Sequence, residues 1–283
     1  MGCLPIEPGA MMNDTESEVF QLRRGTASLI VSMPHVGARV PEEIEHGFTP
    51  VARALTDTDW YVDRLYDFVP ELGGSVIAAR YSRYVIDLNR PPDDAALYPG
   101  MTSTGLCPTH SFAGEPLYGS SVDVLPAAEI ELRRQRYWQP YHDGLAALIA
   151  DTRRRLGFAL LLDAHSIRSR VPRLFTGRLP DINIGTADGS SCHPDLLRPL
   201  LAILDAQSQF SYVINGRFKG GHITRHYGSP AHGVHALQIE LAQVAYMDED
   251  RVSYDEARAA PLRELLQRVV AALLPFSPAA ASR

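Results

Sequence analysis

Residues 158–166 read FALLLDAHS, an apolar run that ends on Asp163 and is followed at once by His165. A strand buried on both faces has this continuous apolar pattern, which is typical of parallel sheets covered by helices. Ligands of such sheets bind just beyond the carboxyl ends of the strands. The stretch therefore predicts a buried strand whose polar end lies at a binding site.

Predicted strands and helices alternate along the rest of the chain. Further strands are expected at residues 27–33, 75–79, 84–88, 212–215 and 234–240. Helices are expected from about residue 56, at 126–156 with a bend near Pro140, at 194–207 and at 255–274. This alternation predicts an α/β fold with a mixed, mostly parallel central sheet.

The chain has no long linker that would separate two domains. Residues 1–24 are expected to form a loose leader, and residues 25–283 a single α/β domain. Residues 91–124 are rich in Pro, Gly, Ser and Thr and are predicted to form a long loop. Loops of this length inside a compact domain usually serve a function.

Composition argues against several classes of protein. The 283 residues carry a net charge of -6, whereas nucleic-acid-binding domains usually have a basic surplus. No apolar run approaches the roughly 18 residues of a transmembrane helix, and the N-terminus lacks the pattern of a secretory signal. Three widely spaced cysteines fit reduced cytosolic thiols. We therefore expect a cytoplasmic protein that acts on a small molecule, without nucleic-acid or membrane partners and with its oligomeric state left open.

Polar clusters follow four of the predicted strands: PHVG at 34–37, DLNR at 87–90, DAHS at 163–166 and QIE at 238–240. One edge of a sheet would gather all four into a single pocket. Two histidines and a carboxylate are the minimal ligand set of catalytic zinc, which lowers the pKa of bound water to about 7. Glu240 ends a strand with apolar neighbours, where a carboxylate is costly without a purpose. The sequence thus predicts a metal site, with Glu240 as the general base beside it.

The same blocks resemble the N-formylglutamate amidohydrolase family, over roughly residues 25–275. The resemblance is carried by PHVG, DLNR, DAHS and QIELAQ, and by DTDWYVDRLY at 57–66 and KGGHITRHYG at 219–228. It implies a phosphorylase/hydrolase-like three-layer α/β sandwich, as in zinc carboxypeptidases and aspartoacylase. It also implies one zinc, or another divalent ion, per chain, and hydrolysis of N-formyl-L-glutamate to formate and L-glutamate in histidine degradation.

The resemblance implies roles for particular residues as well. His35 would be the first metal ligand, His165 the last, and Glu240 the catalytic glutamate. The relatives have His-x-x-Glu as their first ligand pair, whereas this chain has Ala38 where that Glu would stand. Asp59 is expected to replace it, and Asp57 and Asp63 are the alternatives. Asp59 could instead belong to a helix-capping box that begins at Thr56.

The implied substrate is a dianion, so its pocket needs positive charge, and arginine binds carboxylates through two parallel hydrogen bonds. RYVIDLNR at 83–90 is similar to the segment by which aspartoacylase binds a substrate carboxylate. The match implies that Arg83, Asn89 and Arg90 bind one carboxylate of the substrate. Candidates for the second carboxylate are His222, Arg225 and His226 in the glycine-rich loop, and Arg168 and Arg170 after His165.

Three other functions are compatible with the residues. The first is hydrolysis of another N-acyl amino acid, such as N-acetylglutamate or N-formylaspartate. The second is a binding protein that keeps the fold without catalysis. The third is a serine hydrolase that uses Ser166, although the chain has no G-x-S-x-G motif around it.

Overall fold

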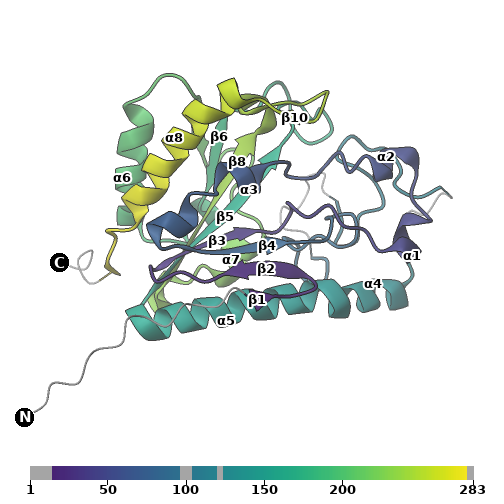
Figure 1. Ribbon diagram of the computed structural model, residues 1–283, viewed down its shortest axis with the longest axis horizontal. Helices are drawn as coiled ribbons and strands as arrows, with labels where there is room; N and C mark the ends of the chain where they lie inside the picture. Colours follow the sequence, from purple (N-terminus) through teal and green to yellow (C-terminus); the bar gives the residue numbers. More distant parts are fainter. Residues whose placement is uncertain (1–14, 96–103, 120–123, 279–283) are drawn as a thin grey trace, which may run out of the picture.

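The computed structural model describes residues 15–95, 104–119 and 124–278 of the chain. Its centre is an eight-stranded sheet with the order β1-β2-β4-β3-β5-β8-β6-β7, and Figure 1 shows helices on both sides of it. The strands are β1 Thr15–Glu16, β2 Phe20–Arg23, β3 Leu29–Met33, β4 Ser75–Ala79, β5 Ala159–Ile167, β6 Ile182–Gly185, β7 Tyr212–Ile214 and β8 Val234–Ala242. A separate hairpin pairs β9 Met247–Asp248 with β10 Ser253–Tyr254.

The four central strands, β4, β3, β5 and β8, are parallel to one another. On either side of them, β2 is antiparallel to β4, and β6 is antiparallel to β8. The predicted mixed, mostly parallel sheet is therefore confirmed. Because β3, β5 and β8 run in the same direction, their carboxyl ends meet at one edge of the sheet, as the sequence predicted.

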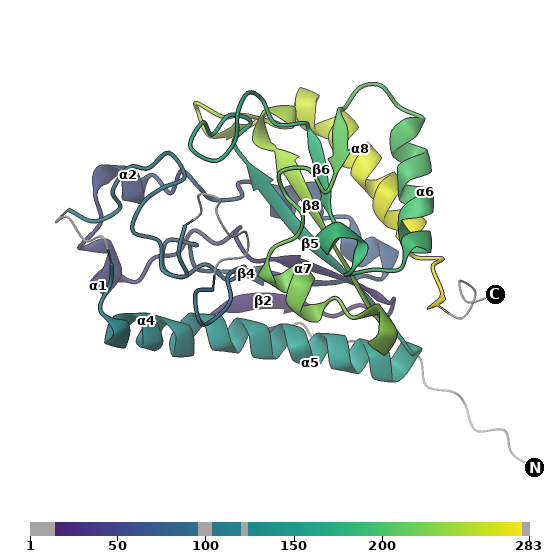
Figure 2. The same cartoon turned by 180° about the vertical axis from the view of Figure 1, so that it is seen from behind.

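Helices cover both faces of the sheet and make a three-layer sandwich (Figures 1 and 2). One face carries α4 Ala127–Arg133, the π-helix η2 Arg134–Trp138, α5 Gln139–Leu156 and α7 His222–Tyr227. The other face carries α3 Val62–Leu65, α6 Pro194–Asp205 and α8 Glu256–Leu273. The remaining short helices are α1 Glu42–Glu45, α2 Pro50–Arg53, η1 Val69–Leu72, η3 Ala187–Gly189, η4 Pro230–His232 and η5 Gln243–Ala245.

All nine residues of β5 are buried, and the apolar side chains from Ala159 to Leu162 alternate between two apolar clusters. Leu161 belongs to the cluster under α5 with Tyr141, whereas Leu162 belongs to the cluster under α8 with Leu266. Burying a side chain of this size contributes about 1.5–3 kcal/mol, so the continuous apolar run favours a strand between two helical layers. The alternation also places His165 on the α5 face, the same face as Leu161.

The long helix predicted at 126–156 is present and changes its winding where a bend was expected. The π-helix η2 ends at Trp138, two residues before Pro140. Proline has no N–H to donate to the preceding turn, and a π segment is a common accommodation within a helix.

Two predicted elements are wrong. Residues 84–88 form a buried turn instead of a strand, because Val85 N donates to Ser82 O and Asp87 N to Leu106 O, so neither joins the sheet. The helix predicted from about residue 56 is reduced to α3 and the 3-10 helix η1. Tyr61, with φ of 62°, takes the left-handed conformation there and interrupts the helix.

The predicted boundary at residue 25 is too late. Strands β1 and β2 lie within the expected leader, and Phe20 and Leu22 pack into the apolar cluster under α5. The first fourteen residues lie outside the described part of the chain, as does part of the predicted 91–124 loop, whose described residues contain no helix or multi-residue strand.

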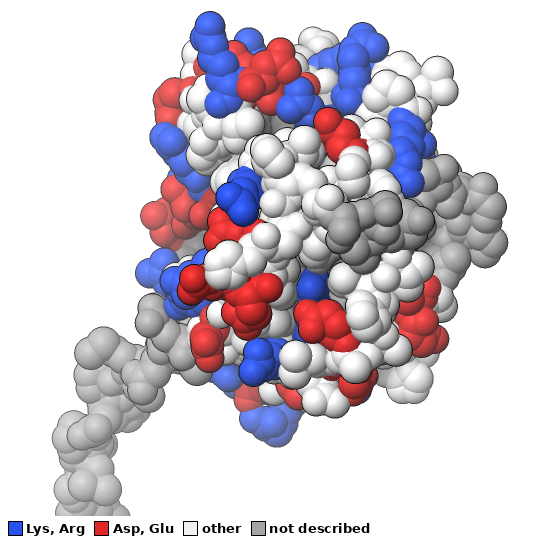
Figure 3. Space-filling model, turned by 90° about the vertical axis from the view of Figure 1, so that its right-hand side faces the viewer, with Lys and Arg blue, Asp and Glu red and all other residues white. Residues whose placement is uncertain are grey.

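No helix in the described ranges is both long and apolar enough to cross a bilayer. On the face drawn in Figure 3, acidic and basic side chains are interspersed.

Candidate active site

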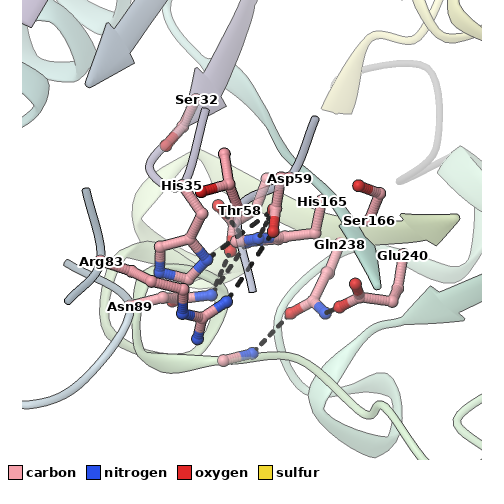
Figure 4. Close-up of polar contacts among 12 residues, drawn as sticks. Ser32, His35, Thr58, Asp59, Arg83, Asn89, His165, Ser166, Gln238 and Glu240 are labelled. Atoms are coloured by element: carbon pink, nitrogen blue, oxygen red, sulfur yellow. Dashed lines mark hydrogen bonds and ion pairs between the residues drawn. The ribbon is translucent and has the colours of Figure 1, made fainter. Parts of the chain in front are cut away.

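Three residues from distant parts of the chain meet at the carboxyl edge of the sheet. His35 follows β3, Asp59 precedes α3, and His165 lies near the end of β5. Asp59 Oδ2 lies 3.0 Å from His165 Nδ1 and 3.7 Å from His35 Nδ1, and the imidazole centroids are 4.9 Å apart. One ligand atom from each residue lies within 4.8 Å of the others (Figure 4). These are the two histidines and the first of the three candidate aspartates that the resemblance implied as metal ligands.

The cluster has the properties of a cation site. His35 Nδ1 and Asp59 Oδ1 are buried and have no hydrogen-bond partner among the described residues. A buried polar atom without a partner costs about 1–3 kcal/mol, and a bound cation would supply the partner. Two nitrogens and a carboxylate match the donor set of a catalytic divalent metal with an open position.

The alternative carboxylate ligands do not join this cluster. Asp57 is buried, but its Oδ2 accepts a hydrogen bond from Phe112 N at 2.7 Å, and the residue lines a second cavity. Asp63 is exposed on α3. Of the three aspartates in this segment, only Asp59 is within reach of both histidines.

Two further aspartates orient the histidine rings. Asp87 Oδ1 lies 2.7 Å from His35 Nε2, and Asp163 Oδ1 lies 3.0 Å from His165 Nε2. With each Nε2 facing a carboxylate, the Nδ1 atoms turn toward Asp59, which is the arrangement that outer-shell carboxylates give to metal-bound histidines.

The charges around the two histidines differ. Burial and the neighbouring Arg83 charge lower the pKa of His35, although Asp87 opposes them, so this ring favours the neutral form that binds metals. Burial also opposes a charge on His165, but Asp163 and Asp59 outweigh it and raise the pKa of that residue. The negative field that attracts a proton to His165 would equally attract a cation.

Glu240 lies beside this cluster because of the register of the sheet. In the parallel pairing of β5 with β8, His165 is opposite Glu240 and Asp163 is opposite Gln238. Glu240 is 6% exposed, and burial raises the pKa of its carboxyl to about 8. A buried carboxyl with a raised pKa, next to a metal-type cluster, is suited to accept and return a proton near neutral pH.

Gln238 holds the Glu240 carboxylate, a contact that the sequence analysis did not identify. Gln238 Oε1 accepts a hydrogen bond from Gly221 N at 2.7 Å, which leaves its Nε2 to donate to Glu240 Oε2 at 3.0 Å. The two side chains lie together next to the cluster in Figure 4. Their spacing of two residues on one strand, which puts both on the same face, was the available signal.

A cavity opens over the cluster. Its walls comprise residues of the cluster and its neighbours, several apolar side chains and three arginines: His35, Arg83, Asp87, Asn89, Arg90, Thr104, Phe112, His165, Ser166, Ile167, Leu174, Arg217, Phe218, Gly221, Gln238 and Glu240. Arg217 was not among the residues that the sequence analysis selected.

The three residues of the RYVIDLNR segment at 83–90 that were expected to bind substrate all line the cavity, but their environments differ. Arg83 donates to Asp87 Oδ2 at 2.6 Å, and its guanidinium lies 4.4 Å from the centre of the Phe112 ring. Asn89 donates to Asp163 Oδ2 at 3.1 Å and accepts from Ile223 N at 2.8 Å, so its amide is already engaged. Arg90 has no ion pair with another described residue.

The expected second set of substrate ligands does not line this cavity. His222 is buried against Trp138 and stacks on His226, and Arg225 Nε donates to Gly220 O at 2.8 Å. Arg168 and Arg170 line the second cavity instead.

Ser166 has no contact that would make it a nucleophile. It lines the cavity, but its hydroxyl lies 3.3 Å from Gln243 Nε2, and no histidine within the described ranges hydrogen-bonds to it. Figure 4 shows it apart from the His35–His165 cluster.

Comparison with known proteins agrees with the geometry. Residues 27–247 match the N-formylglutamate amidohydrolase family. The chain is 52% identical to an N-formylglutamate deformylase of Pseudomonas aeruginosa over 263 residues, which cover 90% of this chain and 97% of the relative. It is 48% identical to a protein of the same name from Pseudomonas putida, over 91% of this chain and 96% of the relative.

Solved structures have the same fold. The crystal structure of an N-formylglutamate amidohydrolase from Ralstonia eutropha superposes with a TM-score of 0.76 at 27% identity, covering 90% of this chain and 96% of that one. A gene product from Agrobacterium tumefaciens superposes with a TM-score of 0.66 at 20% identity, over 91% and 96% of the two chains. On the extent of these matches, the chain belongs to the N-formylglutamate amidohydrolase family.

Proposed function

We propose that the protein hydrolyses N-formyl-L-glutamate to formate and L-glutamate with the help of a divalent cation, zinc being the best fit. The names of the two Pseudomonas relatives support the substrate. The observation that carries the proposal is the buried convergence of His35, Asp59 and His165, with Glu240 opposite His165 in the sheet.

The cation would be held by His35, Asp59 and His165. When bound, a divalent ion supplies Lewis acidity, which lowers the pKa of water and polarises a carbonyl group. Asp87 and Asp163 keep the two imidazoles in the orientation that this binding requires.

Glu240 acts as the proton carrier. It accepts a proton from the water whose oxygen attacks the formyl carbon, and it returns that proton to the amide nitrogen as the C–N bond breaks. The hydrogen bond from Gln238 Nε2 fixes the carboxylate. Because Glu240 is nearly buried, its proton affinity is high enough for both steps near neutral pH.

Arg83 stabilises the negative charge that develops on the formyl oxygen. Its guanidinium is buried in the cavity wall, with Nη1 3.8 Å from Asp59 Oδ1, so it lies against the metal-type cluster. Arg90 is left to bind a substrate carboxylate, and Asn89 positions Asp163 by donating to its Oδ2.

Formate release from N-formyl-L-glutamate tests the proposal. N-acetylglutamate and N-formylaspartate serve as comparison substrates, and the assay is repeated after chelation and after zinc is restored. We expect the highest kcat/KM on N-formylglutamate, loss of activity on chelation, and recovery with zinc. A higher kcat/KM on either comparison substrate would mean that this compound, and not N-formylglutamate, is the preferred substrate. The absence of any hydrolysis would favour a binding role.

A further inference from the structure

Asp59 differs from the other two residues of the metal-type cluster in how the fold holds it. His35 follows β3 and His165 lies in β5, and these strands pair in the sheet, whereas Asp59 lies in an irregular segment between α2 and α3. That segment contains two residues in the left-handed conformation, Leu55 with φ of 49° and Tyr61 with φ of 62°. Backbone of this kind persists only where surrounding contacts fix it, so the position of the Asp59 carboxylate depends on those contacts.

Two buried side chains hold the residues on either side of Asp59. Gln243 Nε2 donates to Thr58 O at 3.0 Å. Tyr246 OH donates to Trp60 O at 2.8 Å. Gln243 is 2% exposed and Tyr246 is fully buried. The backbone is therefore anchored one residue before Asp59 and one residue after it, which limits how far the carboxylate can move.

The Gln243 amide also contacts the strand that carries the second histidine. Its Nε2 donates to Ser166 Oγ at 3.3 Å, in the residue that follows His165. An amide NH2 group has two hydrogens, so one can donate to Ser166 and the other to Thr58. Gln243 thus ties the segment of Asp59 to β5, and a side chain without a donor would lose both bonds.

We propose that Gln243 and Tyr246 are positioning residues for the metal ligand Asp59, an inference that rests on the proposed function. Both follow the end of β8, the strand that carries Glu240. One stretch of chain therefore supplies the proposed general base and the two side chains that hold the ligand outside the sheet. Metal affinity depends on such support, because a ligand that is not held in place must be ordered when the ion binds.

The affinity for zinc, measured by competition with a chromophoric chelator, tests the proposal. Gln243→Met keeps the length of the side chain and removes its NH2 group. We expect the Kd for zinc to rise by about 10-fold, at the lower end of the effect of losing an outer-shell partner. Tyr246→Phe removes only the hydroxyl group and should also raise the Kd. Because its ring fills the same space, this variant tests the proposal independently of how well Gln243→Met folds.

Gln207→Met is the matched control. Gln207 Nε2 donates to two backbone carbonyls, Leu204 O at 3.1 Å and Phe210 O at 2.8 Å, but the residue follows α6 and does not line the cavity. The free energy of unfolding of the metal-free protein is measured for each variant as well. A purely structural role would lower this free energy and leave the Kd for zinc unchanged, which is the result that we expect for Gln207→Met.

A Kd for zinc that rises in Gln243→Met and in Tyr246→Phe, but not in Gln207→Met, supports the positioning role. A wild-type Kd in the first two variants, or an equal rise in all three, would overturn that role while leaving the proposed function intact. Wild-type protein that binds no zinc would overturn the metal site of the proposed function, and this inference with it.

Discussion

His165 on β5 and Glu240 on β8 are direct partners in the parallel sheet, with both side chains on the same face. A shift of one residue in this pairing would turn Glu240 to the opposite face, against α8. The distance between the metal-type cluster and Glu240, the proposed general base, is therefore set by two fully buried strands and not by a loop.

Glu240→Gln should keep the divalent cation and lose most of the hydrolysis. The amide preserves the shape of the side chain but cannot carry the proton, and general acid–base catalysis contributes about 100- to 10,000-fold. Metal content and kcat measured on the same preparation check this. A kcat within about threefold of the wild type would remove Glu240 from the chemistry.

Asp163→Asn should weaken metal binding by about 10- to 100-fold, because the carboxylate that orients His165 is lost. Competition with a chromophoric chelator measures the change. Asp57→Asn is the control: this aspartate is also buried near the cluster, but it binds Phe112 N and not a histidine. Equal weakening in the two variants would contradict the orienting role of Asp163.

Acid should destabilise the protein partly through His142. Burial lowers the pKa of this residue to about 3, and its Nε2 donates to Leu88 O at 2.8 Å. In the unfolded chain the same histidine has a pKa of about 6.5, so as the pH falls it is protonated before the folded protein is. The contribution of His142 to the free energy of unfolding is therefore fully present above about pH 6.5 and is lost as the pH falls toward 3.

His142→Gln should flatten this dependence. Between pH 4 and 6, the slope of the unfolding free energy against pH should fall by about 1.4 kcal/mol per pH unit. This is the slope that corresponds to one proton taken up on unfolding. Urea titrations at several pH values measure the slope. His46→Gln, a change at an exposed histidine, should leave it unaltered; a slope that is the same in all three proteins would contradict the prediction.

Leu161→Ala should lower the free energy of unfolding by about 2–5 kcal/mol, because it opens a cavity under α5 in a strand that is buried on both faces. Leu156→Ala, at a position 41% exposed, should cost far less. Equilibrium denaturation compares the two; similar losses would mean that β5 is less tightly packed than described.

Much of the site could be predicted because its residues follow apolar strands. FALLLDAHS indicated β5, and the parallel strand ends indicated the meeting of His35 with His165 before any distance was known. Asp59 was harder to identify, since its turn is set by tertiary contacts such as Asp59 N to His35 O at 3.0 Å.

The other features of the fold and the site depend on tertiary contacts that leave no local pattern in the sequence. Residues 84–88 are as apolar as a strand, but they are buried by packing without entering the sheet. Arg217 lines the cavity, and its Nε donates to Leu174 O, 43 positions earlier in the chain. The charge and glycine content of the loop at 219–228 favoured His222 and Arg225 as substrate ligands, but neither residue lines the cavity.

The central claim is that His35, Asp59 and His165 hold a cation that hydrolysis requires. Elemental analysis of the purified protein, paired with formate release from N-formylglutamate, tests it most directly. We predict one divalent ion per wild-type chain, with both metal and activity lost in His165→Ala. Full activity in wild-type protein that contains no metal would contradict the account.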